Sequence, residues 1–547
     1  MRRGAPLVSL AIGVAGTVLG LGLTRAQGPA KTAGRSRPSV RRAAAATPIQ
    51  HLVVIFQENE SFDHYFGSYP NAANPSGEPQ FNPLPNTPTV NGYTTGLLTN
   101  NPNFLNQNNG VGVANPFRLD RLQILVADQD NGYTAEQMGY DAGLVDLVPL
   151  SMGAAGPPPE PPPGTVNTTG LTMGYYDGNT VTALWNYAQH FAMSDNSHET
   201  VFGATLLGHI NLISGQTNGV SQNLNGSGAL TDGGNGSSTL IANADPIGDV
   251  CGTTTKEELT MGGPNIGDGL TSAGVTWGWF VGGFDLTVVN PNGTTGCNRS
   301  STSPLTGVTQ TDYDPHYDPF QYYPSTANPT HARPTSVFTI GHPGDAANNQ
   351  YDVKDFFAAV KAGNFPSVSF LKAPSYETGH PAKSDPLDEQ FFVVNILNFL
   401  QQQPSWSSTA VVIAWDDSDG WYDHQLGPIV NQSNGTADAL TGTDACGNGN
   451  NSLPGMDPAN LHALGRCGYG PRLPLLVISP YAKPNFVDHT LTDQTSVLRF
   501  IEDNWLGGQR LGAGSFDAIA GPLDNMFSFT QAPNPTLLLN PQTGEPE

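Results

Sequence analysis

Charged side chains are scarce in this sequence, and basic ones are scarcest. Only 12% of the 547 residues are Asp, Glu, Lys or Arg, and 22 Lys and Arg stand against 46 Asp and Glu, for a formal net charge of -24. A chain so poor in cations is not suited to binding nucleic acid through its phosphates. A site that handles an anion would therefore depend on cations placed locally.

Long apolar runs are also lacking, apart from one near the N-terminus. Arg2 and Arg3 precede an apolar stretch over residues 6–23, and small residues follow at positions 24 and 26. This pattern predicts an export signal over residues 1–26, with an uncleaved membrane anchor as the alternative. No later run reaches the length of about 18 residues needed to span a bilayer. We expect a secreted or periplasmic protein that keeps no membrane span after signal removal.

Cysteine is limited to four residues, Cys251, Cys297, Cys446 and Cys467. They fall into two local pairs, although three pairings are formally possible. In an exported protein we expect Cys251–Cys297 and Cys446–Cys467 disulfides. A zinc site with cysteine ligands is disfavoured because the sequence has no C-x-x-C motif or neighbouring His cluster.

Glycine and proline are plentiful, at 64 and 46 residues, yet short apolar segments recur along the chain. Apolar runs predict strands, and helical spacing predicts helices, in alternation. The predicted strands cover residues 51–56, 368–371, 409–413 and 473–479, and the predicted helices cover residues 181–191, 388–402 and 493–505. This alternation indicates an α/β fold with a doubly wound, mostly parallel sheet.

The domain organisation follows from where these elements lie. We expect one catalytic domain over residues 48–530, preceded by a basic, disordered lead-in at residues 27–47 and followed by a polar tail at residues 531–547. Three Gly/Asn/Pro-rich tracts are expected to be surface insertions: residues 70–115, 150–170 and 215–250.

Paired polar residues directly follow two of the predicted strands. Asp416 and Asp417 come after the strand at residues 409–413, and Glu58 and Asn59 come after the first strand. Adjacent carboxylates repel one another unless a cation neutralises them or both stay in water. Ligands of open α/β sheets bind at the carboxyl ends of the strands. Either segment alone is typical of a polar turn, but together they predict a metal site with oxygen ligands.

Thr205 is a candidate nucleophile. It follows Gly203 and Ala204 and precedes a stretch with helical spacing, so its hydroxyl would lie at a helix N-terminus, where backbone N–H groups favour phosphate. Metal coordination would activate such a hydroxyl. The same position is also typical of an ordinary helix cap.

The chain resembles the bacterial phosphoesterase family that contains acid phosphatases and phosphatidylcholine-type phospholipases C. The resemblance extends from residue 49 to about residue 505 and rests above all on the segments Gln57-Glu-Asn-Glu-Ser-Phe-Asp-His-Tyr-Phe-Gly67 and Asp416-Asp-Ser-Asp-Gly-Trp-Tyr-Asp-His424. Four further segments make the acid phosphatase branch look closer: residues 133–137, 211–217, 319–323 and 465–470.

The resemblance implies an alkaline-phosphatase-like core that binds one divalent metal ion, either Ca²⁺, Mg²⁺, Mn²⁺ or Zn²⁺. The positions that match the family's metal ligands are Glu58, Asn59, Asp416 and Asp417. Thr205 matches the nucleophile, and His316 and His380 match histidines that line the phosphate pocket. Asp423 or His424 is expected to support the site from outside.

The chain also departs from the family pattern near the pocket. Asn131 stands where the family usually has His, and Tyr317 follows His316 where a second His is expected. Asn131 is expected to hydrogen-bond a phosphoryl oxygen, but it cannot carry a proton or a positive charge. These changes imply altered specificity, lower activity or loss of activity.

The sequence therefore predicts an exported, metal-dependent phosphoric-ester hydrolase that acts like an acid phosphatase through a phosphothreonine on Thr205. Two alternatives stay open. One is a phospholipase C that acts on phosphatidylcholine-type lipids, and the other is a catalytically weakened protein that binds phosphate ligands. The expected partner is a phosphate ester, either a monoester or a phospholipid head group.

Overall fold

The computed structural model describes residues 44–111, 113–153, 170–234, 236–447 and 463–547. Arg42–Glu547 form one compact unit. The predicted export signal and all but the last few residues of the predicted lead-in lie outside the described residues. Within the described ranges, no helix is both long and apolar enough to cross a membrane.

A nine-stranded sheet forms the centre of the molecule, in the order β13-β10-β14-β1-β15-β16-β4-β17, with β18 also paired to β4. The five strands from β13 to β15 are mutually parallel, whereas β16 is antiparallel to both of its neighbours. The strands are β1 (His51–Gln57), β4 (Ala192–His198), β10 (Trp277–Val281), β13 (Gln350–Asp352), β14 (Val368–Lys372), β15 (Thr409–Trp415), β16 (Arg472–Ile478), β17 (Phe486–Asp488) and β18 (Thr492–Asp493). The predicted α/β class with a mostly parallel sheet is confirmed.

Strand β1 lies between β14 and β15, and its register determines what meets at the sheet edge. Its apolar run is buried almost throughout, as expected for a strand with neighbours on both sides and helices on both faces. Ile55 pairs with Leu371 of β14, and Gln57 pairs with Trp415 of β15. The residues that follow these strands therefore emerge side by side at one edge.

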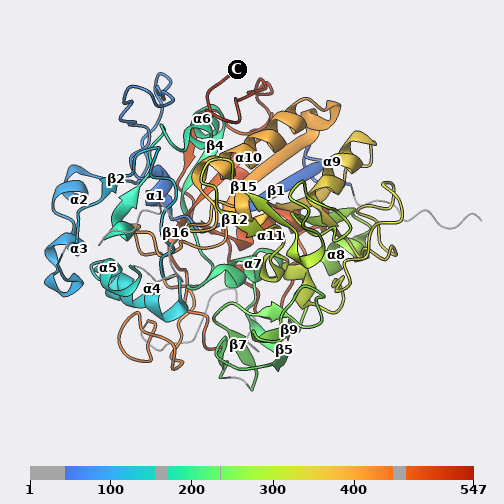
Figure 1. Cartoon of the computed structure of the whole chain (residues 1–547), viewed down its shortest axis with the longest axis horizontal. Coiled ribbons are helices and arrows are strands. Elements are labelled where there is room, and N and C mark those ends of the chain that lie inside the picture. Colours follow the sequence, from blue (N-terminus) through green and yellow to red (C-terminus); the bar gives the residue numbers. More distant parts are fainter. Residues whose placement is uncertain (1–43, 112, 154–169, 235, 448–462) are drawn as a thin grey trace, which may run out of the picture. The chain divides into compact units, whose positions relative to one another are not determined.

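Helices cover both faces of the sheet. One face carries α7 (Thr205–Ser214), α8 (Ile266–Ala273) and α11 (Thr495–Trp505), and the other carries α6 (Thr182–His190), α9 (Val353–Lys361) and α10 (Pro386–Gln401). Figure 1 shows α10 and α7 on opposite sides of β1 and β15. The three predicted helices correspond to α6, α10 and α11, with ends that differ by no more than two residues. The sheet is therefore doubly wound.

Two regions are more ordered than their composition suggests. The tract at residues 215–250, expected to be a surface insertion, contributes most of a small five-stranded sheet in the order β6-β7-β5-β9-β8. Its strands are β5 (Asn218–Leu224), β6 (Leu230–Asp232), β7 (Ser238–Leu240), β8 (Asp245–Pro246) and β9 (Glu258–Met261). The predicted tail packs on α10, where Asn398 donates to the Leu539 carbonyl at 2.7 Å and Gln401 donates to the Leu537 carbonyl at 2.8 Å.

Both expected disulfides are present. Cys251 is bonded to Cys297, and Cys446 is bonded to Cys467. The second bond links the loop after β15 to the segment that leads into β16.

A buried ion network holds the loop after β15 against the segment after β1. The guanidinium of Arg472, at the start of β16, donates to Asp63 at 3.0 Å and to Asp423 at 3.0 and 3.1 Å, and its side chain is completely buried. Asp63 also contacts His424 at 2.6 Å, and this ion pair raises the pKa of the imidazole although burial opposes the shift. Both loops that carry the predicted metal ligands are therefore anchored to one cation.

Replacing that cation should destabilise the fold strongly. Arg472→Met would leave the buried Asp423 without its ion-pair partner and Asp63 with His424 alone, a loss of about 3–5 kcal/mol in the free energy of unfolding. Denaturant titration followed by tryptophan fluorescence measures it. Arg333→Met is the control, since Arg333 is 27% exposed and its pairs with Asp285 and Asp355 should cost less than about 1 kcal/mol. Equal losses in the two variants would contradict the assignment.

Candidate functional site

The carboxyl ends of β1, β14 and β15 bring three acidic or basic side chains into one buried cluster. Glu58 follows β1, Lys372 ends β14 and Asp416 follows β15, and all three side chains are inaccessible to solvent. The Lys372 ammonium contacts Glu58 directly and lies 3.9 Å from Asp416. Ligand atoms of Glu58, Asp416 and His209 lie within 4.8 Å of one another. This cluster is the candidate metal centre.

Helix α7 brings Thr205 to the same place. Strand β4 runs parallel to β15, so its carboxyl end is at the same sheet edge and the following turn leads into α7. The Thr205 hydroxyl donates to Asp417 Oδ2 at 3.1 Å. Gly208 makes the close approach possible, because a Cβ there would lie 2.1 Å from the Asp416 carbonyl oxygen. The candidate nucleophile therefore begins a helix whose backbone touches the segment that carries Asp416 and Asp417.

The carboxylates of the cluster have strongly perturbed pKa values. Burial raises the pKa of Asp416 well above its usual range, and the neighbouring Glu58 carboxylate adds to this shift. Burial also raises the pKa of Asp417, to about 7. Burial acts in the same direction on Glu58, but Lys372, His209 and His380 outweigh it and lower the pKa of Glu58 to about 2. One lysine therefore does not compensate the whole acidic cluster.

The cluster fits a hard divalent cation. Among the described residues, no group donates a hydrogen bond of normal geometry to Glu58 Oε2, Asn59 Oδ1 or Asp416 Oδ2, although all three atoms are buried. Buried oxygens without donors are costly unless a cation binds them. Carboxylate and amide oxygens are ligands typical of Mg²⁺, Ca²⁺ and Mn²⁺. The free oxygens of this cluster are thus suited to such an ion.

The backbone amides and the two asparagines of the predicted site organise these carboxylates. Asp416 Oδ1 accepts hydrogen bonds from the Asn59 amide at 3.1 Å and from the Asp417 amide at 2.9 Å. Asn59 lies at φ +54°, a left-handed conformation that asparagine tolerates well, and its side chain donates to Asp419. Asn131 donates to Asp417 Oδ1 at 2.8 Å, so in this structure it holds a carboxylate rather than facing outward as a free donor.

The two predicted pocket histidines lie in separate acidic surroundings beside the cluster. His316 Nδ1 is 2.8 Å from Asp314 Oδ1, an arrangement that leaves Nε2 for another partner. His380 Nδ1 bonds the Pro381 carbonyl at 2.7 Å, and its ring lies near Asp128 and Asp419. Burial, followed by the charge of Lys383, lowers the pKa of His380. Both rings are nearly inaccessible to solvent.

Sequence reasoning missed three residues of this site. His209 lies four residues after Thr205, on the same side of α7, and this spacing could have indicated it. Lys372 ends a buried strand, where an unpaired charge is rare, and Asp314 precedes His316 by two residues. By contrast, Asp423 and His424 belong to the Arg472 network and contact none of the four predicted metal ligands in any described hydrogen bond or ion pair.

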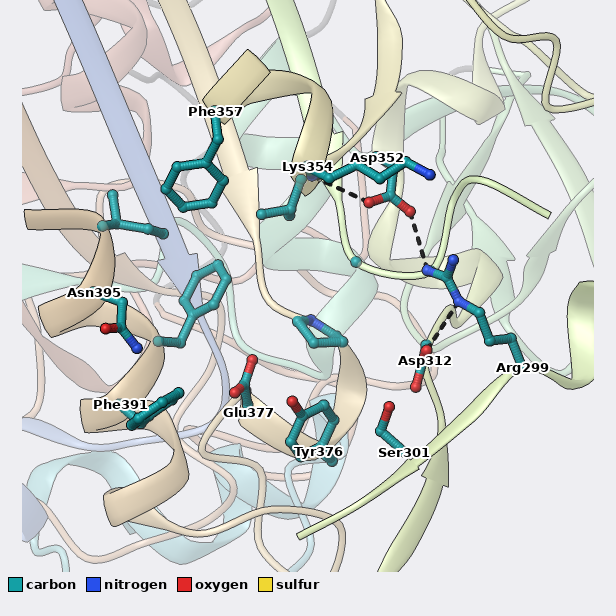
Figure 2. Close-up of a pocket in the computed structure, with 16 residues that line it drawn as sticks. Arg299, Ser301, Asp312, Asp352, Lys354, Phe357, Tyr376, Glu377, Phe391 and Asn395 are labelled. Atoms are coloured by element: carbon teal, nitrogen blue, oxygen red, sulfur yellow. Dashed lines mark hydrogen bonds and ion pairs between the residues drawn. The ribbon is translucent and has the colours of Figure 1, made fainter. Parts of the chain in front are cut away.

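A separate cavity at the same sheet edge is not suited to a phosphate ester. It lies between the ends of β10 and β14 and the helices α9 and α10, and it contains none of the predicted site residues. Figure 2 shows Arg299 between Asp312 and Asp352, at 2.9 and 3.0 Å, with Phe357 and Phe391 on the opposite side. Lys354 is likewise paired with Asp285. Both cations that line this cavity are therefore already neutralised.

Comparison with known proteins identifies the family of the chain. Residues 49–506 match the model of the Phosphoesterase family. The chain is 24% identical to phospholipase C A of Mycobacterium tuberculosis over 90% of its own length and 79% of that protein, and 24% identical to the non-hemolytic phospholipase C of Pseudomonas aeruginosa over 93% of its own length and 61% of that protein.

A solved protein of the alkaline phosphatase superfamily from Vibrio parahaemolyticus is 10% identical and covers 71% of each chain, with a TM-score of 0.28. We draw no conclusion from a structural similarity with that score, and the fold assignment rests on the strand order described above. The family match, in contrast, covers every predicted site residue from Glu58 to Asp417. The chain belongs to the Phosphoesterase family and is a hydrolase of phosphoric esters.

Proposed function

We propose that this protein is a metal-dependent phosphomonoesterase that acts through a phosphothreonine on Thr205. The proposal rests on one hydrogen bond: the Thr205 hydroxyl donates to Asp417 at 3.1 Å, beside the cluster of Glu58 and Asp416. A nucleophile, its hydrogen-bond acceptor and a set of cation ligands thus occupy one site. The two disulfides are consistent with the predicted export to an oxidising compartment.

The chain's own residues perform most steps of this mechanism. A divalent ion held by Glu58, Asn59, Asp416 and Asp417 would supply the positive charge that makes the threonine hydroxyl acidic. Asp417 accepts a hydrogen bond from the hydroxyl and takes its proton as the oxygen attacks phosphorus. The bond from phosphorus to the ester oxygen breaks in the same step, and the departing oxygen takes a proton from water. The N-terminus of α7 favours the incoming anion. Water then attacks the phosphothreonine, which releases phosphate and regenerates Thr205.

His316 and His380 are proposed to bind the phosphoryl oxygens through their Nε2 atoms. In each ring Nδ1 already faces an oxygen, Asp314 Oδ1 for His316 and the Pro381 carbonyl for His380, so Nε2 donates to a phosphoryl oxygen when the ring is protonated on both nitrogens. Donors that are fixed before substrate arrives stabilise the charge that develops during transfer.

Phospholipase C activity is the second candidate function, and the names of the relatives favour it. The chain spans 79% of the mycobacterial phospholipase and 61% of the Pseudomonas enzyme. The chemistry at phosphorus would be the same, but the leaving group would be a diacylglycerol. A weakened, phosphate-binding role remains the third hypothesis, based on Asn131 and Tyr317.

Thr205→Ala should lower turnover of p-nitrophenyl phosphate by about a thousandfold or more, because alanine has no hydroxyl to attack phosphorus. Thr205→Ser is the matched control and should keep activity within about tenfold. Mass spectrometry of acid-quenched enzyme should show one phosphoryl group on the wild-type protein and none on the alanine variant. Normal turnover by a folded Thr205→Ala protein would refute the nucleophile.

Removing the divalent metal ion should abolish turnover reversibly. Dialysis against a chelator should stop hydrolysis, and Mg²⁺, Mn²⁺, Ca²⁺ and Zn²⁺ added back one at a time should identify the ion that restores it. Asp416→Asn should weaken metal binding and turnover together, since it removes a charged ligand. Full activity in the presence of excess chelator would exclude the metal mechanism.

The two candidate activities can be separated with a substrate panel. The metal-loaded protein is expected to hydrolyse p-nitrophenyl phosphate with a higher kcat/KM than bis-p-nitrophenyl phosphate or phosphatidylcholine in mixed micelles. The reverse order would favour phospholipase C. Failure to hydrolyse any of the three would favour the phosphate-binding hypothesis.

A further inference from the structure

Lys372 is a buried cation inside the acidic cluster, and the proposed function gives it no role. It is the last residue of β14, and its side chain has no solvent exposure. The Nζ atom contacts Glu58 and lies 3.9 Å from Asp416 Oδ2. A buried lysine is retained at high cost unless its charge is compensated.

Two aromatic rings also lie close to the ammonium. Nζ lies 4.7 Å from the centroid of the Tyr317 ring and 5.6 Å from that of Phe56. Ring faces of this kind attract a cation but cannot replace a carboxylate as a hydrogen-bond acceptor. The ammonium is therefore confined between two rings and two carboxylates that also form part of the candidate metal centre. Tyr317, a departure from the family pattern, thus forms one wall of the lysine's pocket.

The charges of the cluster explain why a lysine would be useful here. Glu58, Asp416 and Asp417 carry three negative charges when ionised, and Lys372 carries one positive charge. The two negative charges that remain equal the charge of one divalent ion. Three buried carboxylates without the lysine would repel one another strongly in the metal-free protein.

We propose that Lys372 is a built-in cation that shares the carboxylate cluster with a single divalent ion. Its ammonium balances part of the cluster's charge before the ion arrives, so the protein folds without metal. The same charge repels the incoming ion, so the cluster binds metal less tightly than its carboxylates alone would. This inference rests on the metal centre of the proposed function and assigns Lys372 as a positioning residue for it.

Lys372→Met tests the idea because methionine fills similar space without charge. The probe is Mn²⁺ alone, titrated by calorimetry into chelator-treated and dialysed protein. We expect the variant to bind Mn²⁺ about tenfold or more tightly than wild type, since a positive charge beside the ion is gone. We also expect its melting temperature in chelator to fall well below that of wild type and to recover when Mn²⁺ is added.

Lys361→Met is the matched control. Lys361 ends α9 and lies 5.5 Å from the Phe399 ring, but it is exposed and in the described part of the chain it forms no ion pair within 4.0 Å. Its loss should change Mn²⁺ affinity by less than about twofold, because water and salt screen its charge from the metal centre. A Lys372→Met protein with unchanged or weaker Mn²⁺ affinity, or with wild-type stability in chelator, would overturn the proposal.

A charge-compensated variant covers the case in which Lys372→Met does not fold without metal. Lys372→Met combined with Glu58→Gln removes both members of the ion pair and should restore folding in chelator. If the double variant also fails to fold, Lys372 acts through packing and the proposal is wrong. Turnover is a separate measurement: a wild-type protein that binds Mn²⁺ but cleaves no ester contradicts the proposed function and leaves the role of Lys372 intact.

Discussion

The parallel register of β1 between β14 and β15 is the constraint on which the rest of the site depends. Gln57 pairs with Trp415 and Ile55 pairs with Leu371, so Glu58, Asp416 and Lys372 emerge at one edge of the sheet. A shift of one residue in either pairing would turn these side chains to the other face. The buried apolar runs of all three strands fix that register, so the core determines where the charges meet.

The packing around this sheet edge also explains how several charged side chains stay close together in the cluster. Helix α7 packs its backbone directly against Asp416, and the Arg472 network holds the loop after β15 from the other side. Carboxylates that are fixed this firmly cannot separate to relieve their repulsion. A lysine, backbone amides and any bound cation stabilise the carboxylates against this repulsion.

Much of this arrangement could be predicted from the sequence, and the reasons for the failures are physical. Asp416-Asp417 and Glu58-Asn59 directly follow apolar strands, so their convergence requires only the parallel topology that alternating elements imply. Lys372 also ends such a strand, but the sequence does not show that its side chain turns toward Glu58. Asn131 bonds Asp417, a contact across 286 positions that no local pattern encodes. The small sheet within residues 218–261 could not be predicted because its strands are short and mostly polar, so they lack the apolar runs that indicate a strand.

The distances along the chain between the parts of the centre have a consequence for biosynthesis. The Asn59 amide and the Asp416 carboxylate that accepts its hydrogen bond are 357 positions apart, and the second cysteine of the loop that follows lies later still, at position 467. A ribosome releases these segments in order, so a nascent chain has helix α7 long before it has Asp416 and Asp417. The buried cluster of Glu58, Lys372 and Asp416 can therefore assemble only after most of the chain has been made.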